Sequence, residues 1–117
     1  MKESTVLQKS FDFALTIIDL YRKLADKHEY VLSKQILRSG TSIGANVEES
    51  QAGISKRDFI NKMSIASKEA RETRYWLRLL DKSQFITYDY SKYLSDVTEL
   101  IKMLTAIVKT SQKNTKP

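Results

Sequence analysis

The side chains best placed for chemistry form a polar series that interrupts an apolar stripe between residues 35 and 50. With a carboxylate from a later segment, the series comprises Arg38, Ser39, Ser42, Asn46, Glu49 and Glu72. Carboxylates that face one another inside a helical bundle can transfer protons or bind metal ions. A buried polar group without a partner costs about 1–3 kcal/mol, however, so such residues also tend to satisfy one another. We therefore predict a structural polar network, in which amide and hydroxyl groups serve the carboxylates and Arg38 supplies the countercharge.

Few other residues suit catalysis or metal binding. The sequence has no cysteine, and its one histidine, His28, falls in a predicted loop. Di-iron bundles use a Glu-x-x-His motif on two helices, which is missing here. A Gly-rich phosphate loop, a nucleophile elbow and a Ser–His–Asp arrangement are missing as well. We predict no catalytic residue, no metal, no cofactor and no small-molecule substrate. A carboxylate-centred enzyme or metal site on Glu49 and Glu72 is the remote alternative.

A second group of candidate residues is basic. The chain has 20 Lys and Arg against 14 Asp and Glu, a net charge of +6. Residues 54–86 alone carry eight basic and four acidic side chains. Within this segment, steps of three, four and four residues align Arg71, Arg74, Arg78 and Lys82. Clustered exposed cations bind phosphates, so these four are the predicted nucleic-acid-binding residues. The alternative is a solvated face, because Glu69, Glu72 and Asp81 lie close enough in sequence to pair with some of them.

Apolar residues at alternating spacings of three and four predict four helices to position these groups. They lie at about residues 5–27, 31–52, 56–84 and 88–111, followed by a polar tail at 113–117 that frays. The only proline is the last residue, and there are three glycines, so β-hairpins are disfavoured. We predict an all-α, antiparallel up-down-up-down four-helix bundle that forms one domain over residues 1–112.

The ends and faces of these helices can also be predicted. The first helix is expected to bury a seam of Phe11, Leu15, Ile18 and Ala25, on a face widened for two neighbours by Ala14, Ile17, Tyr21 and Leu24. The third should bury Phe59, Met63, Ala66, Ala70, Thr73, Leu77 and Leu80. We expect Gly53 in a left-handed conformation after the second helix, Ser55 as the cap of the third, and Thr87 as the cap of the fourth.

Two glycines lie inside the second predicted helix. Gly40 and Gly44 each cost about 1 kcal/mol relative to alanine there, so they indicate close approach by a backbone or a large side chain. Because Ala66 and Ala70 are small as well, we predict a tight crossing of the second and third helices.

The fourth helix has apolar residues on more than one seam, and Tyr75 and Trp76 lie beside the main seam of the third. Such a wide apolar face predicts packing against two neighbours or an oligomer interface. No apolar run approaches the roughly 18 residues of a membrane span. The first residues, MKESTVLQKSFDF, have no hydrophobic region of a signal peptide. The sequence therefore predicts a cytoplasmic protein with no membrane partner.

The stretch RSGTSIGANVEES, followed by SKRDFINKMSIASKEARETRYWLRLL, resembles the bacterial four-helix-bundle family of 23S ribosomal RNA intervening-sequence proteins. The resemblance extends over about residues 11–104. The matching positions of the family's polar pattern are Arg38, Ser39, Ser42, Ile43, Asn46 and Glu49, with Ser67, Glu69, Glu72 and residues 75–77 on the third helix. Ser50 stands where many members have glycine, which predicts a slightly longer second helix.

This resemblance implies a homopentameric ring. The sequence also resembles accessory proteins of diversity-generating retroelements, which share that assembly and are thought to bind nucleic acid through a basic surface. The leading hypothesis is a non-catalytic, homo-oligomeric module that binds structured RNA or other nucleic acid by its phosphates. The alternative is a protein-interaction scaffold whose basic surface docks an acidic partner.

Overall fold

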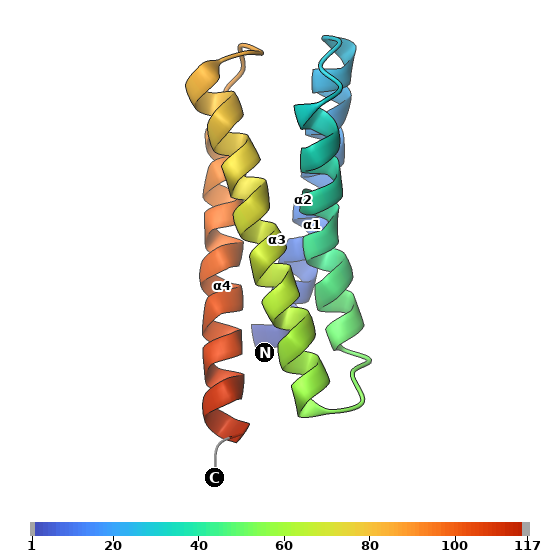
Figure 1. Ribbon diagram of the computed structural model, residues 1–117, viewed down its shortest axis with the longest axis vertical. Helices are drawn as coiled ribbons and strands as arrows, with labels where there is room; N and C mark the ends of the chain where they lie inside the picture. The colour runs from blue at the N-terminus through green and yellow to red at the C-terminus, as the bar shows by residue number, and fades with distance from the viewer. Residues whose placement is uncertain (1, 116–117) are drawn as a thin grey trace.

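The computed structural model describes the backbone of residues 2–115 and the side chains of residues 5–114. Four helices, α1 (Lys2–Asp26), α2 (Leu32–Ser50), α3 (Lys56–Ser83) and α4 (Ser91–Thr115), make up its regular structure. Successive helices run in opposite directions along a body of 52 × 22 × 21 Å (Figure 1). Both α1 and α3 pack against α2 and α4, so α1 and α3 lie at opposite corners. This arrangement confirms the predicted up-down-up-down bundle.

The helix boundaries differ from the predicted ones by a few residues. α1 begins at Lys2, and α2 ends at Ser50 rather than continuing further. α4 begins at Ser91 and extends to Thr115, so residues 113–115 of the predicted tail are helical. Residues 116 and 117 lie outside the described part of the chain. None of the helices in the described part is long and apolar enough to cross a bilayer.

Capping confirms one predicted helix end and corrects two others. Ser55 caps α3, since its hydroxyl accepts the backbone N–H of Asp58 at 3.0 Å. The prediction for Gly53 is wrong, because the left-handed residues of the described chain are His28 and Gln84. Thr87 does not cap α4, which begins four residues later. There the Asp89 carboxylate accepts the hydroxyl of Ser91 and, at 3.0 Å, its backbone N–H. The hydroxyl first and then the N–H lower the pKa of Asp89.

The start of α2 depends on a buried carboxylate that the sequence patterns did not reveal. Glu29 accepts the backbone N–H groups of Val31, Leu32 and Ser33 at 3.1, 3.0 and 2.7 Å. The Ser33 hydroxyl donates in return to the Glu29 carbonyl at 2.6 Å. A negative charge at a helix N-terminus satisfies otherwise unpartnered donors and complements the helix dipole. This bonding fixes the turn between α1 and α2.

The core follows the predicted seam on α3 but not on α1. On α3, Met63, Ala66, Ala70, Thr73, Leu77 and Leu80 are buried, and Phe59 is partly buried. On α1 the buried residues are Val6, Ser10, Phe13, Ile17, Leu20 and Leu24, of which Ile17 and Leu24 belong to the predicted widening of the face. The predicted seam residues Phe11 and Leu15 are instead 60% and 53% exposed. The wide apolar face of α4 packs inside the bundle. Its buried residues include Leu100, Ile101, Leu104 and Ile107.

The two glycines of α2 face α1. A Cβ on Gly40 would lie 2.8 Å from Cγ2 of Ile17, and one on Gly44 would lie 3.2 Å from the carbonyl oxygen of Ser10. The prediction that these glycines serve a crossing of α2 with α3 is therefore wrong. Ile17 is β-branched and buried, so it has little freedom to move away from a larger residue at position 40. The glycines thus set the separation of α1 and α2.

Candidate functional site

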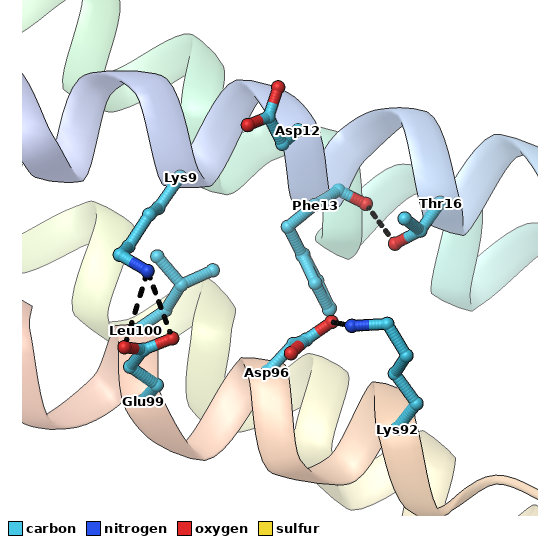
Figure 2. A pocket seen from close by; sticks show the side chains of 8 residues that line it. All are labelled: Lys9, Asp12, Phe13, Thr16, Lys92, Asp96, Glu99 and Leu100. Carbon is cyan, nitrogen blue, oxygen red and sulfur yellow. Dashed lines mark hydrogen bonds and ion pairs between the residues drawn. The ribbon is translucent and has the colours of Figure 1, made fainter.

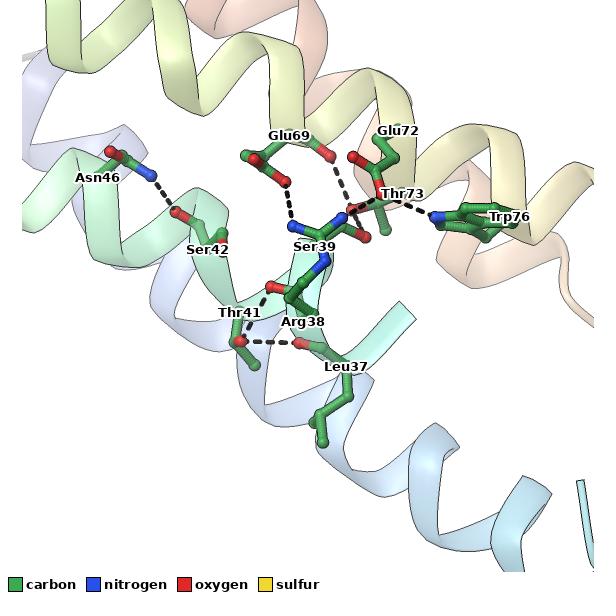
Figure 3. Close-up of polar contacts among 10 residues, drawn as sticks. All are labelled: Leu37, Arg38, Ser39, Thr41, Ser42, Asn46, Glu69, Glu72, Thr73 and Trp76. Atoms are coloured by element: carbon green, nitrogen blue, oxygen red, sulfur yellow. Dashed lines mark hydrogen bonds and ion pairs between the residues drawn. The ribbon is translucent and has the colours of Figure 1, made fainter. Parts of the chain in front are cut away.

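The flank of α3 that faces α2 carries carboxylates joined to a single arginine (Figure 3). The Arg38 guanidinium of α2 lies 3.2 Å from Glu69 and also contacts Glu72. The indole N–H of Trp76 donates to Glu72 at 3.0 Å. These two donors, Trp76 first and then Arg38, lower the pKa of the Glu72 carboxyl below its ordinary value. The arrangement crosslinks α2 to α3 and gives the two carboxylates one shared countercharge.

Beneath this crosslink, two buried hydroxyls connect the same helices. Oγ1 of Thr73 lies 2.8 Å from Oγ of Ser39 and 2.8 Å from the carbonyl oxygen of Glu69. A carbonyl can only accept and a hydroxyl has one proton, so Thr73 donates to Glu69 and accepts from Ser39. Both side chains are fully buried, and no buried side-chain polar atom among the described residues lacks a partner.

The remaining members of the predicted network do not join it. Asn46 donates to the backbone carbonyl of Ser42, one turn earlier, at 2.9 Å (Figure 3). Glu49 is exposed and pairs with Lys62 of α3 at 2.9 Å. Of the six predicted residues, the structure therefore brings only Arg38 and Glu72 into contact across two helices, while Ser39 lies beside them. The single network predicted along α2 is wrong, and separate local contacts replace it.

Three partners were missed by the sequence patterns: Lys62, Thr73 and Trp76. Thr73 occupies a position in the predicted apolar seam, which does not indicate a polar contact. A threonine in one seam that faces a serine in another could have predicted a hydroxyl pair. Trp76 follows Glu72 by four residues, the spacing at which helical side chains meet. Glu49 lies on α2 and Lys62 on α3, so their spacing in the sequence does not predict the pair. It forms only because α2 packs against α3.

The other flank of α3 carries the predicted nucleic-acid-binding residues, and it faces α4. Nη2 of Arg71 donates to Oγ1 of Thr105 on α4 at 3.2 Å, which fixes the orientation of this flank. Arg74, Arg78 and Lys82 follow it at helical spacing. Within the part of the chain that the structure describes, none of the four forms an ion pair. The expected pairing with Glu69 and Glu72 is not formed, because both face α2.

α4 extends this positive surface. Lys102 and Lys109 lie three residues before and four residues after Thr105, on the same side of α4. Both are exposed, and neither is ion-paired among the described side chains. We define the cationic strip as Arg71, Arg74, Arg78, Lys82, Lys102 and Lys109. The two lysines were missed because they belong to a different helix and join the strip only through packing.

A hollow lies between α1 and α4, and both of its lysines are ion-paired (Figure 2). Lys9 pairs with Glu99 at 3.3 Å, and Lys92 pairs with Asp96 at 3.0 Å. The hollow has a volume of about 190 Å³. Within residues 5–114, no three histidine, aspartate or glutamate side chains come together as metal ligands. Asp12, the remaining charge at the hollow, accepts the Gln8 amide at 2.9 Å, so among the described residues the hollow has no unpaired cation comparable to the cationic strip.

The fold and the strip define a class: basic, antiparallel four-helix bundles with polar crosslinks between their middle helices. Within that class, the profile of the family described as 23S rRNA-intervening sequence protein matches residues 2–106, and the chain belongs to this family. This confirms the resemblance seen in the sequence.

A solved structure from Bacteroides thetaiotaomicron VPI-5482 is similar over almost the whole chain. It is a protein of unknown function from the S23 ribosomal protein family, 50% identical in sequence. The match covers 93% of this chain and 99% of that protein, with a TM-score of 0.89. A comparison with curated proteins finds no match.

Proposed function

We propose that this protein is a non-catalytic module that binds structured RNA or another nucleic acid through the cationic strip and assembles with copies of itself. The observation that supports binding is the lack of carboxylate partners for the strip among the described residues. A phosphate that binds there displaces no internal ion pair. By contrast, Arg38 is already committed to Glu69 and Glu72.

The dimensions of the strip suit a phosphate backbone. Arg71 and Lys82 are eleven residues apart, which corresponds to about 16 Å along a helix. One strand of a duplex presents a phosphate about every 3.4 Å along its axis, so several phosphates fit this length. Arginine and lysine contacts to phosphates position a duplex without reading its sequence. We therefore propose recognition of the backbone and the shape of the nucleic acid rather than of its bases.

Exposed apolar pairs support self-assembly. Phe11 and Leu15 lie one turn apart on α1, and Tyr75 and Leu79 lie one turn apart on α3, all exposed. Because α1 and α3 occupy opposite corners, a contact between unlike pairs joins copies head to tail, and such contacts form a ring when the rotation between copies closes. We propose a ring of five copies, as the family resemblance implies. A ring repeats the strip and raises the affinity for a long polyanion.

Binding is tested with a labelled RNA hairpin and a DNA duplex by fluorescence anisotropy across a series of KCl concentrations. The variant is Arg71→Glu/Arg74→Glu/Arg78→Glu. Its matched control, Arg22→Glu/Lys34→Glu/Lys56→Glu, changes the net charge equally at scattered exposed positions. Each phosphate contact contributes about 0.7–0.9 to the slope of log K against log salt, so the strip variant is expected to lose roughly two to three units of slope.

The control is expected to keep most of the slope and affinity. An equal loss in both variants would mean that only net charge matters, and the strip would then not be the site. No binding by the unmodified protein at low salt would overturn the nucleic-acid proposal and direct attention to an acidic protein partner.

Self-assembly is tested by light scattering on the purified protein. A ring of five has five times the chain mass of 13.5 kDa. We expect Phe11→Glu/Leu15→Glu to reduce the mass to that of smaller species. The control, Val31→Glu/Ile54→Glu, replaces two exposed apolar loop residues and is expected to leave the mass unchanged. A monomeric unmodified protein at micromolar concentration would contradict the proposal.

A further inference from the structure

The turn between α3 and α4 holds one large apolar side chain in solvent. Phe85 is 69% exposed, although burial of a phenylalanine is normally favourable. It follows Lys82, the last α3 residue of the cationic strip, by three positions. The strip therefore leads along α3 toward Phe85. The turn in which α3 gives way to α4 lies at one end of the bundle (Figure 1).

This turn is well ordered by hydrogen bonds. Gln84 adopts a left-handed conformation with φ of 46°, and its backbone N–H donates to the carbonyl of Leu80 at 2.9 Å. Its side-chain amide donates to the carbonyls of Asp81 and Tyr88 at 2.9 and 3.3 Å. The N–H of Phe85 donates to the Ser83 hydroxyl at 3.1 Å. The backbone position of Phe85 is therefore fixed before any ligand binds.

Of the other exposed aromatic residues, Phe11 lies on α1, at the corner opposite α3, and the three tyrosines already have neighbours. Lys23 lies 5.3 Å from the ring centroid of Tyr88, which also packs edge-on against Tyr90. Tyr30 packs edge-on against His28, and Tyr75 against Trp76. Phe85 makes no ring contact with any aromatic or cationic side chain in the described part of the chain. Beside the cationic strip, its ring faces are therefore available for a new partner.

We propose that Phe85 stacks on an unpaired base next to a duplex whose backbone lies along the cationic strip. This inference rests on the proposed nucleic-acid function and narrows its ligand to a junction between duplex and single strand. Every base has a π-face, so an aromatic side chain stacks on an unpaired base without reading its identity. Bases inside a duplex are covered by their neighbours, so only a terminal or unpaired base reaches the ring.

The test uses two RNA hairpins with the same stem, one blunt and one with a three-nucleotide single-stranded extension. The first unpaired position carries 2-aminopurine, whose fluorescence falls on stacking, and extensions at the 3′ and 5′ ends are both measured. The proteins are the unmodified chain, Phe85→Ala, Phe85→Trp and the control Ile54→Ala. Ile54 is an exposed apolar residue in the loop at the opposite end of the bundle.

We expect the unmodified protein to quench one extended probe and to bind it at least fivefold more tightly than the blunt hairpin, as base–aromatic stacking allows. Phe85→Ala is expected to lose the quenching and the preference, while its affinity and salt slope for the blunt hairpin are unchanged. Phe85→Trp and Ile54→Ala should behave like the unmodified protein.

Three results overturn the inference. If Phe85→Ala keeps the quenching and the preference, the ring does not stack on the base, although the strip proposal stands provided that its charge-reversed variant still loses binding. If the charge-reversed variant binds normally, the cationic strip is not the binding surface, and the proposed placement of the duplex fails with it. If Phe85→Ala instead lowers the mass measured by light scattering, Phe85 belongs to a contact between protein chains.

Discussion

α3 presents one flank to α2 and another to α4, and the two flanks differ in how their charges are partnered. Facing α2, Glu69 and Glu72 are both bound to Arg38, and Thr73 pairs with Ser39. Facing α4, Arg71 contacts only a neutral hydroxyl, and the cations that follow it have no ion-pair partner in the described chain. The comparison separates polar groups that fix the packing of the bundle from polar groups that are free to meet a ligand.

The largest effect on stability is expected from Thr73→Val. The change leaves the buried Ser39 hydroxyl without its partner, which costs about 1–3 kcal/mol of unfolding free energy, as measured by urea denaturation. Ser39→Ala/Thr73→Val removes both polar groups and is expected to cost much less than the two single changes added together. On the opposite flank, Arg74→Gln should alter stability by less than about 0.5 kcal/mol. Equal losses for Thr73→Val and Arg74→Gln would remove the distinction between the flanks.

A smaller loss is expected from Arg38→Met, which leaves two partly buried carboxylates without their countercharge. Because the arginine is half exposed, solvent screens the interaction and we expect a cost of about 1 kcal/mol. Adding Glu72→Gln should recover part of it, because one unpaired charge is removed. Affinity for nucleic acid should stay within about twofold, as measured by anisotropy. A large drop in affinity would place Arg38 in the binding surface.

The α2-facing flank also predicts that the stability of the fold decreases at acidic pH. Trp76 and Arg38 lower the pKa of Glu72 in the folded chain. The contribution of Glu72 to stability is therefore complete above its unfolded pKa, about 4.3, and is lost as the pH falls through the lower folded value. Urea titrations between pH 6 and pH 3 should show a steeper loss for the unmodified chain than for Glu72→Gln. Parallel profiles would mean that Glu72 is not responsible.

The smallest effect is expected from Glu49→Gln. Glu49 and Lys62 form an exposed pair, and such pairs contribute little. We expect the melting temperature to change by less than about 2 °C. If Glu49 belonged to a buried network along α2, Glu49→Gln would instead lower stability as much as Thr73→Val does.

The sequence predicts the helices well because their apolar spacing is local information. α3 shows this most clearly, since only one of its faces is apolar at every turn and that face is the buried one. α1 is different: its apolar residues cover more than one face, so two seams satisfy the same spacing. The choice of Ile17 and Leu20 over Phe11 and Leu15 depends on where α2 and α4 lie. Periodicity within one helix does not contain that information.

The polar contacts were harder to predict because each depends on the relative position of two helices. Arg38 and Glu72 were paired correctly because their charges are opposite and few other partners exist on those faces. Asn46 was not, because its short side chain reaches a carbonyl of its own helix before it reaches α3. Likewise, Lys102 and Lys109 join the strip only because α4 packs beside Arg71. Charge and spacing identify candidates, and packing decides their partners.

The seam between α1 and α4 has a consequence for how the chain folds and opens. These two are the only neighbouring helices in the described bundle that are not consecutive in sequence, and their mutual contacts are the sparsest of the four neighbouring pairs. Joining them closes the longest loop in the molecule, which carries the largest entropic cost and gains the least packing in return. This seam is therefore expected to form last during folding and to part first during local unfolding. In native-state hydrogen exchange, amides whose protection depends on this seam should accordingly exchange before those of the α2–α3 crosslink.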